Sequence, residues 1–111
     1  MFLDDIREPK NDYDVIVRSF EEAITFVKNN GIPNFISFDH DLGSDNMGNV
    51  LKDGYDFAKW LVDMDIENIY KFPDDFSFNI HSANPIGRNN INSILNNYLI
   101  FKVRYKDTSE D

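Results

Sequence analysis

The sequence contains no cysteine, no long apolar run and no excess of positive charge. Without cysteine, the chain has no disulfides and no thiolate metal ligands, which fits a reducing cytoplasm. No apolar run approaches the ~20 residues that a membrane span requires, and no secretion signal is recognisable at the N-terminus. We therefore expect a cytoplasmic protein with no membrane association.

The charge of the chain is strongly unbalanced. It carries 20 acidic and 11 basic residues, and the net charge is −9 at pH 7. Such a chain repels a long polyanion, so we expect no binding of long duplex nucleic acid. A small nucleotide or a nucleic-acid end needs only one local cationic pocket and stays compatible with this charge. The composition leaves the oligomeric state open.

The length of 111 residues and the hydrophobic content of 41% suit one domain with one core. We predict this domain over residues 1–105. Residues 106–111 are acidic and nearly free of apolar side chains, so we expect them to form a disordered tail.

Three ionisable residues follow an apolar run near the middle of the chain. The run is Phe35–Phe38, and Asp39, His40 and Asp41 come directly after it. A strand buried on both faces belongs to a sheet that is covered by helices, and such sheets bind ligands beyond the carboxyl ends of their strands. The sequence therefore predicts a site at the end of this strand.

Two other predicted strands end in the same way. The first, at residues 1–3, is followed by Asp4, Asp5 and Arg7, and the last, at residues 76–80, is followed by His81, Ser82 and Asn84. Only a parallel arrangement brings these three ends together. The chain has two histidines, and both lie at such ends, which favours a functional reading over a packing role for each ring.

Capping signals predict the helices. Ser19 with Glu22 forms a capping box, Asp53 suits the N-cap of a second helix, and Asn84 suits the N-cap of a third that begins at Pro85. The strand at residues 13–17 follows a loop of about nine residues, which is short for a helical crossover. We favour a parallel edge for this strand over a hairpin, although its direction stays open.

One more short strand is expected near the end of the domain. It would consist of the apolar residues Ile100, Phe101 and Val103.

The order of these elements resembles the receiver domains of response regulators. Asp4 and Asp5 match the acidic pair of that family, Asp39 matches the phosphoacceptor, and Ser82 matches the hydroxyl position. The resemblance implies an α/β fold, a small receiver-like (flavodoxin-like) sandwich with a mostly parallel sheet of four to five strands and about three helices. The first receiver helix is missing, as is the Lys-Pro pair after a fifth strand, and these departures argue against phosphorelay signalling.

A closer resemblance covers nearly the whole chain. The segments that carry it are similar, in this order, to the cyclic-phosphate processing receiver domains: Phe2–Arg7 with Pro9, Val17–Ala23, Ile36–Gly43, Gly54–Asp56 and His81–Arg88. This resemblance implies a small intracellular bacterial or phage protein that opens cyclic phosphates left by RNA repair or nucleotide metabolism. The expected partner is a small nucleotide or another cyclic-phosphate ligand.

Opening a cyclic phosphate requires a base that activates water and an acid that protonates the leaving oxygen. An imidazole titrates near neutral pH, so His40 and His81 are predicted to form this pair, with their individual roles left open. Asp39 or Asp41 would orient a histidine and fix its tautomer.

Cations must also hold the phosphoryl oxygens. Arg88 lies in the first turn of a predicted helix, where free amides already favour anions, and is the first candidate. Arg7 is the second, while Ser82 and Asn84 are candidates for hydrogen bonds to the phosphate or the ribose.

Two alternatives stay open at this point. Asp4, Asp5, Asp39 and Asp41 could hold Mg²⁺ or Mn²⁺ through oxygen ligands in a metal-dependent phosphoesterase, although we favour catalysis without a cofactor. Alternatively, the same pocket could bind a nucleotide without cleaving it, as a sensor or sponge.

Overall fold

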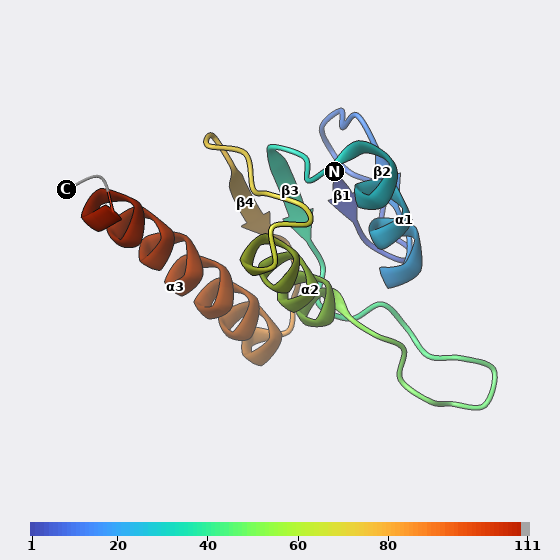
Figure 1. Cartoon of the computed structure of the whole chain (residues 1–111). Helices are drawn as coiled ribbons and strands as arrows, with labels where there is room; N and C mark the ends of the chain where they lie inside the picture. Colours follow the sequence, from blue (N-terminus) through green and yellow to red (C-terminus); the bar gives the residue numbers. More distant parts are fainter. Residues whose placement is uncertain (110–111) are drawn as a thin grey trace.

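The computed structural model describes residues 1–109, with side chains up to residue 104. Four strands and three helices make up this part of the chain (Figure 1). In chain order they are β1 (Phe2–Leu3), β2 (Ile16–Val17), α1 (Phe20–Asn30), β3 (Phe35–Phe38), α2 (Gly54–Ile66), β4 (Ser77–Ile80) and α3 (Pro85–Ser109).

The four strands form one parallel sheet in the order β2-β1-β3-β4. The sheet confirms the predicted α/β class and the favoured parallel direction of the second strand. Because all four strands point the same way, their carboxyl ends lie along one edge of the sheet. The three strand ends that carry the predicted site residues therefore meet, as expected.

The helices begin at the predicted caps, but the capping box predicted at Ser19 is incomplete, because the Glu22 carboxylate accepts from the Arg18 amide and not from the Ser19 amide. The Ser19 hydroxyl accepts a hydrogen bond from the Glu22 amide at the start of α1. Asp53 and Asp56 exchange side-chain and backbone hydrogen bonds in a complete capping box at the start of α2. The apolar faces that follow these caps pack on the sheet and form the core. None of the helices in the described part of the chain is long and apolar enough to cross a bilayer.

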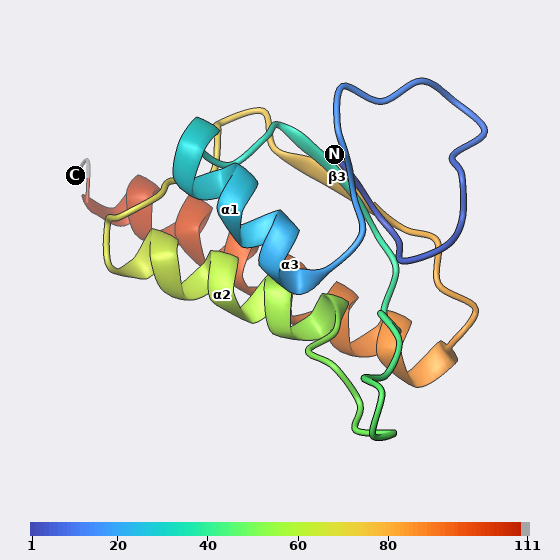
Figure 2. The same ribbon diagram turned by 90° about the vertical axis from the view of Figure 1, so that its right-hand side faces the viewer.

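All three helices lie on the same side of the sheet, and the loop between β1 and β2 lies on the other side (Figure 2). No helix connects β1 to β2, and this missing helix is the one that would cover the other face of the sheet. The ring of Tyr13, from that loop, lies 5.2 Å from the Phe2 ring and 6.2 Å from the Phe35 ring. Loop side chains therefore cover part of the face that a helix would otherwise cover.

The predicted last strand is wrong, because Ile100, Phe101 and Val103 belong to α3. A short apolar run fits a strand and one side of a helix equally well, and here the helix continues through it. The helix includes residues 106–109, while residues 110 and 111 lie outside the described part of the chain. The disordered tail that the sequence predicts over residues 106–111 therefore stays a prediction.

A buried carboxylate fastens α3 to α2. The Asp65 side chain is 1% exposed, and it accepts hydrogen bonds from the Phe72 amide at 2.9 Å, from the Lys102 ammonium at 3.1 Å and from the Tyr98 hydroxyl. Burial raises the pKa of Asp65, but the bonds from Tyr98, Phe72 and Lys102 outweigh burial, and the pKa lies below its ordinary value. The ionised form is thus the one that the fold stabilises.

Replacing Asp65 by asparagine is expected to lower the free energy of unfolding by about 2 kcal/mol at pH 7, since it removes charge-assisted hydrogen bonds from a buried site. Because the folded pKa is depressed, this contribution is present above the unfolded pKa and is lost as pH falls through the folded pKa. Urea unfolding at pH 7 and over a series of lower pH values measures both effects. The exposed Asp63, also in α2, provides the control substitution, and an equal loss in Asp63→Asn would contradict the assignment.

Candidate functional site

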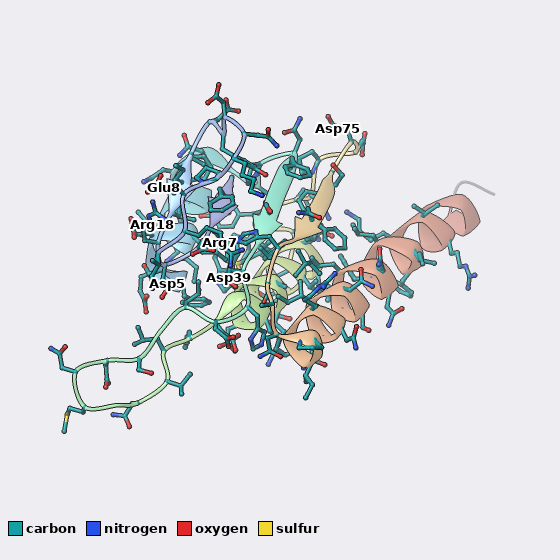
Figure 3. The ribbon with its side chains drawn as sticks, turned by 180° about the vertical axis from the view of Figure 1, so that it is seen from behind. Asp5, Arg7, Glu8, Arg18, Asp39 and Asp75 are labelled. Carbon is teal, nitrogen blue, oxygen red and sulfur yellow. The ribbon has the colours of Figure 1, made fainter. Side chains whose placement is uncertain are left out.

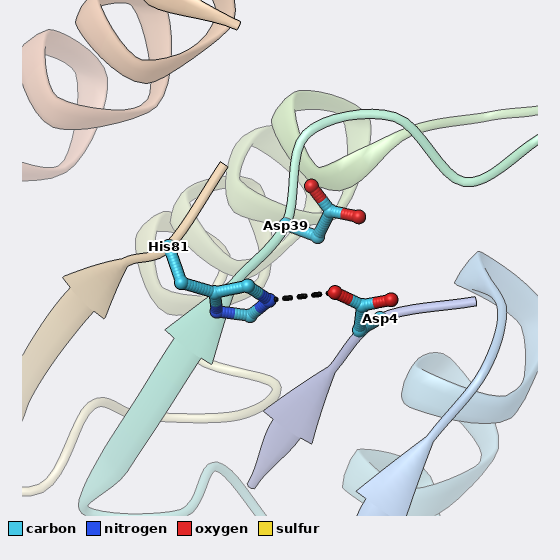
Figure 4. A group of neighbouring side chains, drawn as sticks. All are labelled: Asp4, Asp39 and His81. Carbon is cyan, nitrogen blue, oxygen red and sulfur yellow. Dashed lines mark hydrogen bonds and ion pairs between the residues drawn. The ribbon is translucent and has the colours of Figure 1, made fainter. Parts of the chain in front are cut away.

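Asp4, Asp39 and His81 come together at the carboxyl edge of the sheet (Figure 4). They follow β1, β3 and β4, and each offers one oxygen or nitrogen atom such that all three atoms lie within 4.8 Å of one another. We call these three residues the edge cluster. The parallel sheet places residues from three distant segments of the chain in one site.

The His81 ring is held on three sides. Its Nε2 lies 3.0 Å from Asp4 Oδ2, and its Nδ1 lies 2.8 Å from the Ser37 hydroxyl oxygen. The ring also stacks on Phe2, with centroids 4.5 Å apart and planes within 4°. These contacts leave the ring little freedom, so its nitrogens have fixed positions relative to the carboxylates.

The partners of His81 define one neutral tautomer. The Asp4 carboxylate only accepts hydrogen bonds, so Nε2 carries the proton, and Nδ1 accepts from the Ser37 hydroxyl. The Asn79 amide in turn donates to the Ser37 oxygen at 3.4 Å. Ser37 is 1% exposed, which makes it a positioning residue for the ring and excludes a nucleophilic role toward a substrate.

Asp4 is the structural anchor of the edge cluster. Its Oδ1 accepts hydrogen bonds from the amides of Ile6 and Arg7, at 2.9 and 2.7 Å. Burial raises the pKa of Asp4, but these two amides and His81 outweigh burial, so the pKa lies below its ordinary value. Asp4 therefore stays ionised and orients His81.

Asp39 has the opposite character. Burial and then the negative charge of Asp4 raise the pKa of Asp39, and the hydrogen bond from the His40 amide and the nearby His81 offset this only in part. A raised pKa makes a carboxylate a stronger base. Two neighbouring carboxyl groups whose pKa values are pushed apart are a common arrangement in sites that perform acid–base chemistry.

Two arginine side chains lie beside the cluster: Arg7 on the loop between β1 and β2, and Arg18 between β2 and α1 (Figure 3). The Arg7 guanidinium donates to the His81 carbonyl at 3.1 Å, and its Nε lies 4.0 Å from Asp4 Oδ2. Its side chain is 58% exposed, so it stays accessible to a ligand. Arg18 donates to the carbonyls of Asp4 and Arg7 and pairs with Glu8, which fixes the course of the loop.

His40 has a different environment from His81. Its Nδ1 lies 2.9 Å from Asp41 Oδ1, and its Nε2 lies 3.2 Å from Asp53 Oδ2. A Cβ added at Gly87 would lie 2.2 Å from His40 Cγ, so the ring packs directly on the first turn of α3. His40 thus joins the two ends of the loop between β3 and α2 to α3, and no contact joins its ring to His81 in the described structure.

The other predicted binding residues lie outside the edge cluster, and Asn84 Nδ2 donates to Asp41 Oδ2 at 3.5 Å. Ser82 is buried and its hydroxyl accepts from the Asn84 amide, while Asn84 Oδ1 accepts from the Gly87 amide at the start of α3. These two side chains build the turn before the helix. Arg88 lines a groove between β4 and α3 that none of the edge-cluster residues lines. Its predicted role as the first phosphate ligand stays a prediction.

Sequence reasoning missed two residues near the histidines. The sequence places Ser37 within the apolar strand and predicts Asp53 only as a helix N-cap, with no contact to a histidine for either residue. The available signal for Ser37 was its place as the one polar residue between the buried Ile36 and Phe38. For Asp53 no signal pointed to His40, because the contact depends on how the loop of residues 41–53 closes.

The edge cluster also has the donor set of a cation site. Two carboxylates and an imidazole suit Mn²⁺ or Zn²⁺ better than Mg²⁺, which prefers oxygen ligands throughout. Of the four predicted metal ligands, the structure brings Asp4 and Asp39 together. Asp41 instead bonds His40, and a Cβ added at Gly43 would lie 3.2 Å from Asp5 Oδ2, so Asp5 faces the start of the β3–α2 loop.

A parallel sheet with an acidic pair after β1 and an aspartate after β3 defines a receiver-like α/β domain. The chain matches the cyclic-phosphate processing receiver domain over residues 1–97 and belongs to that family. Searches among curated proteins and among solved structures gave no match.

Proposed function

We propose that this protein opens a cyclic phosphate on a nucleotide or on an RNA-derived end, and that the edge cluster carries the reaction. The observation behind this proposal is the convergence of Asp4, Asp39 and His81 within 4.8 Å at the carboxyl edge of the sheet. This edge is where parallel α/β sheets bind their ligands. The family to which the chain belongs points to the same class of ligand.

In the proposed reaction, a water oxygen bonds to phosphorus and the bond from phosphorus to one ribose oxygen breaks. Asp39 accepts a proton from the water, and its raised pKa suits this role. In this step His81 acts as the imidazolium: its Nε2 exchanges the hydrogen bond to Asp4 Oδ2 for one to the leaving oxygen and gives up that proton, while Nδ1 keeps its proton facing Ser37. The product is a linear phosphomonoester, and solvent returns the proton from Asp39 to His81.

Arg7 is the proposed phosphate ligand. Its guanidinium lies beside Asp4 and His81, and its side chain is largely exposed. A planar guanidinium binds two phosphoryl oxygens at once, which holds phosphorus in one place relative to Asp39. A single local cation of this kind suits a small anionic ligand on a chain whose net charge is −9.

The two-histidine mechanism expected from the sequence is the alternative version of this function. It would require His40 to act on the same phosphate as His81, whereas His40 is not one of the three residues of the edge cluster and its ring packs on α3. We therefore assign the second proton transfer to Asp39. Cytoplasmic action on products of RNA repair stays part of the proposal.

A metal-dependent phosphoesterase is the second candidate, because the three atoms of the edge cluster could each bind one divalent ion. Such an ion would polarise the phosphoryl group as a Lewis acid. In that case the hydrogen bond between Asp4 and His81 would break, and both side chains would bind the ion instead.

Incubation with 2′,3′-cyclic mononucleotides, followed by ³¹P NMR, tests the proposal. We expect the cyclic signal to be replaced by that of a linear monoester, and we expect the rate to survive EDTA. Loss of turnover on chelation, with recovery on adding Mn²⁺, would favour the metal-dependent version. Binding that returns the cyclic nucleotide intact would instead identify a sensor and would contradict catalysis.

A further inference from the structure

The strand β4 lies at one edge of the sheet and leaves half of its backbone groups without a strand partner. The amides of Ser77 and His81 donate to the Asn34 and Phe38 carbonyls, on the β3 side. In a parallel ladder the direction of these groups alternates along the strand. The N–H and C=O groups of Phe78 and Ile80 therefore point away from β3, and no further strand lies there within residues 1–109.

A groove of about 480 Å³ runs along this edge, between β4 and the first turns of α3. It is lined by Phe78, Asn79, Ile80, Pro85, Arg88, Asn89 and Asn92. One residue of this lining, Arg88, carries a charge, and three others are amides that both donate and accept hydrogen bonds. The groove therefore offers hydrogen bonds along its length and one positive charge, although the chain as a whole is acidic.

The order of the elements indicates what the groove lacks. The helix α1 leads from β2 to the parallel strand β3, and α2 leads from β3 to the parallel strand β4. The helix α3 follows β4 in the same way, yet no strand follows it within the described residues. The unpaired edge of β4 is thus the position that a fifth parallel strand would occupy.

We propose that the groove binds an extended segment of a partner polypeptide, which adds a fifth strand to the sheet beside β4 and pairs a carboxylate with Arg88. Main-chain groups of Phe78 and Ile80 would bond the added strand, as in other cases of strand addition at an exposed sheet edge. The single positive charge in the lining favours an acidic residue of the partner.

Other occupants fit the groove less well. A nucleic acid would need several cations along its backbone, whereas the lining has only Arg88. A second copy of this chain, paired through its own β4 edge, would bring a second Arg88 and no carboxylate from the groove lining to pair with it. Both are outcomes that the experiment distinguishes from the proposal.

The test uses the ¹⁵N-labelled protein and two strand-forming peptides of alternating threonine and valine, one with glutamates near its centre and one with lysines in their place. We expect the glutamate peptide, at about 1 mM, to slow amide exchange of Phe78 and Ile80 by about tenfold, since bound ligand stabilises the paired state. The amides of Asn79 and His81 are expected to be protected already in the free protein.

A charge exchange makes the test specific. The Arg88→Glu variant should no longer bind the glutamate peptide and should bind the lysine peptide instead. The matched variant Lys28→Glu, in the last turn of α1, should bind the two peptides as the parent protein does. No protection at Phe78 and Ile80 with the glutamate peptide would overturn the proposal. So would self-association through β4 in sedimentation experiments, or binding of a short RNA in the groove.

Discussion

Replacement of His81 by alanine is expected to lower the rate of cyclic-phosphate opening by about 100-fold or more, the loss typical of an acid–base group. The ring is the proposed proton donor, and it is held between Asp4 and Ser37 in a fixed orientation. The measurement is kcat/KM against pH. The parent should lose activity as pH falls, because Asp39, whose pKa is raised, becomes protonated, and the variant should keep this acid limb at a much lower rate.

His40→Ala is the matched variant for this prediction. If Asp39 and His81 form the acid–base pair, His40→Ala keeps the acid limb of the profile and loses less activity than His81→Ala. Its main effect should be on the packing of the β3–α2 loop against α3, because the ring contacts Asp41, Asp53 and Gly87. An equal loss of kcat in the two variants, with unchanged stability, would restore the two-histidine mechanism.

Replacement of Gly54 by alanine is expected to lower the free energy of unfolding by about 3 kcal/mol, the upper range for overpacking. A Cβ at this position would lie 1.9 Å from the Asp39 carbonyl oxygen and 3.0 Å from its carbonyl carbon. These are backbone atoms, so no change of rotamer relieves the clash. The start of α2 would have to move away from the end of β3, and Asp39 would move with it.

Helix propensity alone predicts the opposite sign, because alanine is the better helix former. Urea unfolding of Gly54→Ala decides between the two effects. Asp63→Ala, at an exposed position of α2, is the control and should change stability by about 0.5 kcal/mol or less. A Gly54→Ala variant as stable as the parent would show that the close approach of α2 to β3 is not needed.

The local signals in the sequence were enough for most of the fold. The caps at Ser19 and Asp53 fixed the starts of two helices, because a capping side chain acts within three residues of its own position. The prediction of a strand at residues 100–103 is wrong because the neighbouring residues do not distinguish a strand from the apolar face of a helix. The helical state of these residues depends on continuity with α3, which the sequence around them does not reveal.

The candidate site was predictable where it follows from strand direction. Asp4, Asp39 and His81 meet because their strands are parallel and end at one edge, and this needs no knowledge of side-chain angles. The positions of His40 and Arg88 depend on how a long loop closes and on the rotation of α3 about its axis. Neither quantity is set by nearby residues, so the sequence does not reveal that Arg88 lines a groove which neither histidine lines.

The bond between Asp4 and His81 joins residues that are 77 positions apart, nearly the full length of the matched domain. A contact of such high contact order forms only when the long segment between its ends has closed, so the proposed catalytic centre is absent from a partly folded chain. Recovery of turnover during refolding should therefore follow the slowest step seen by any spectroscopic probe. Activity thus serves as a gauge of complete folding in this small domain.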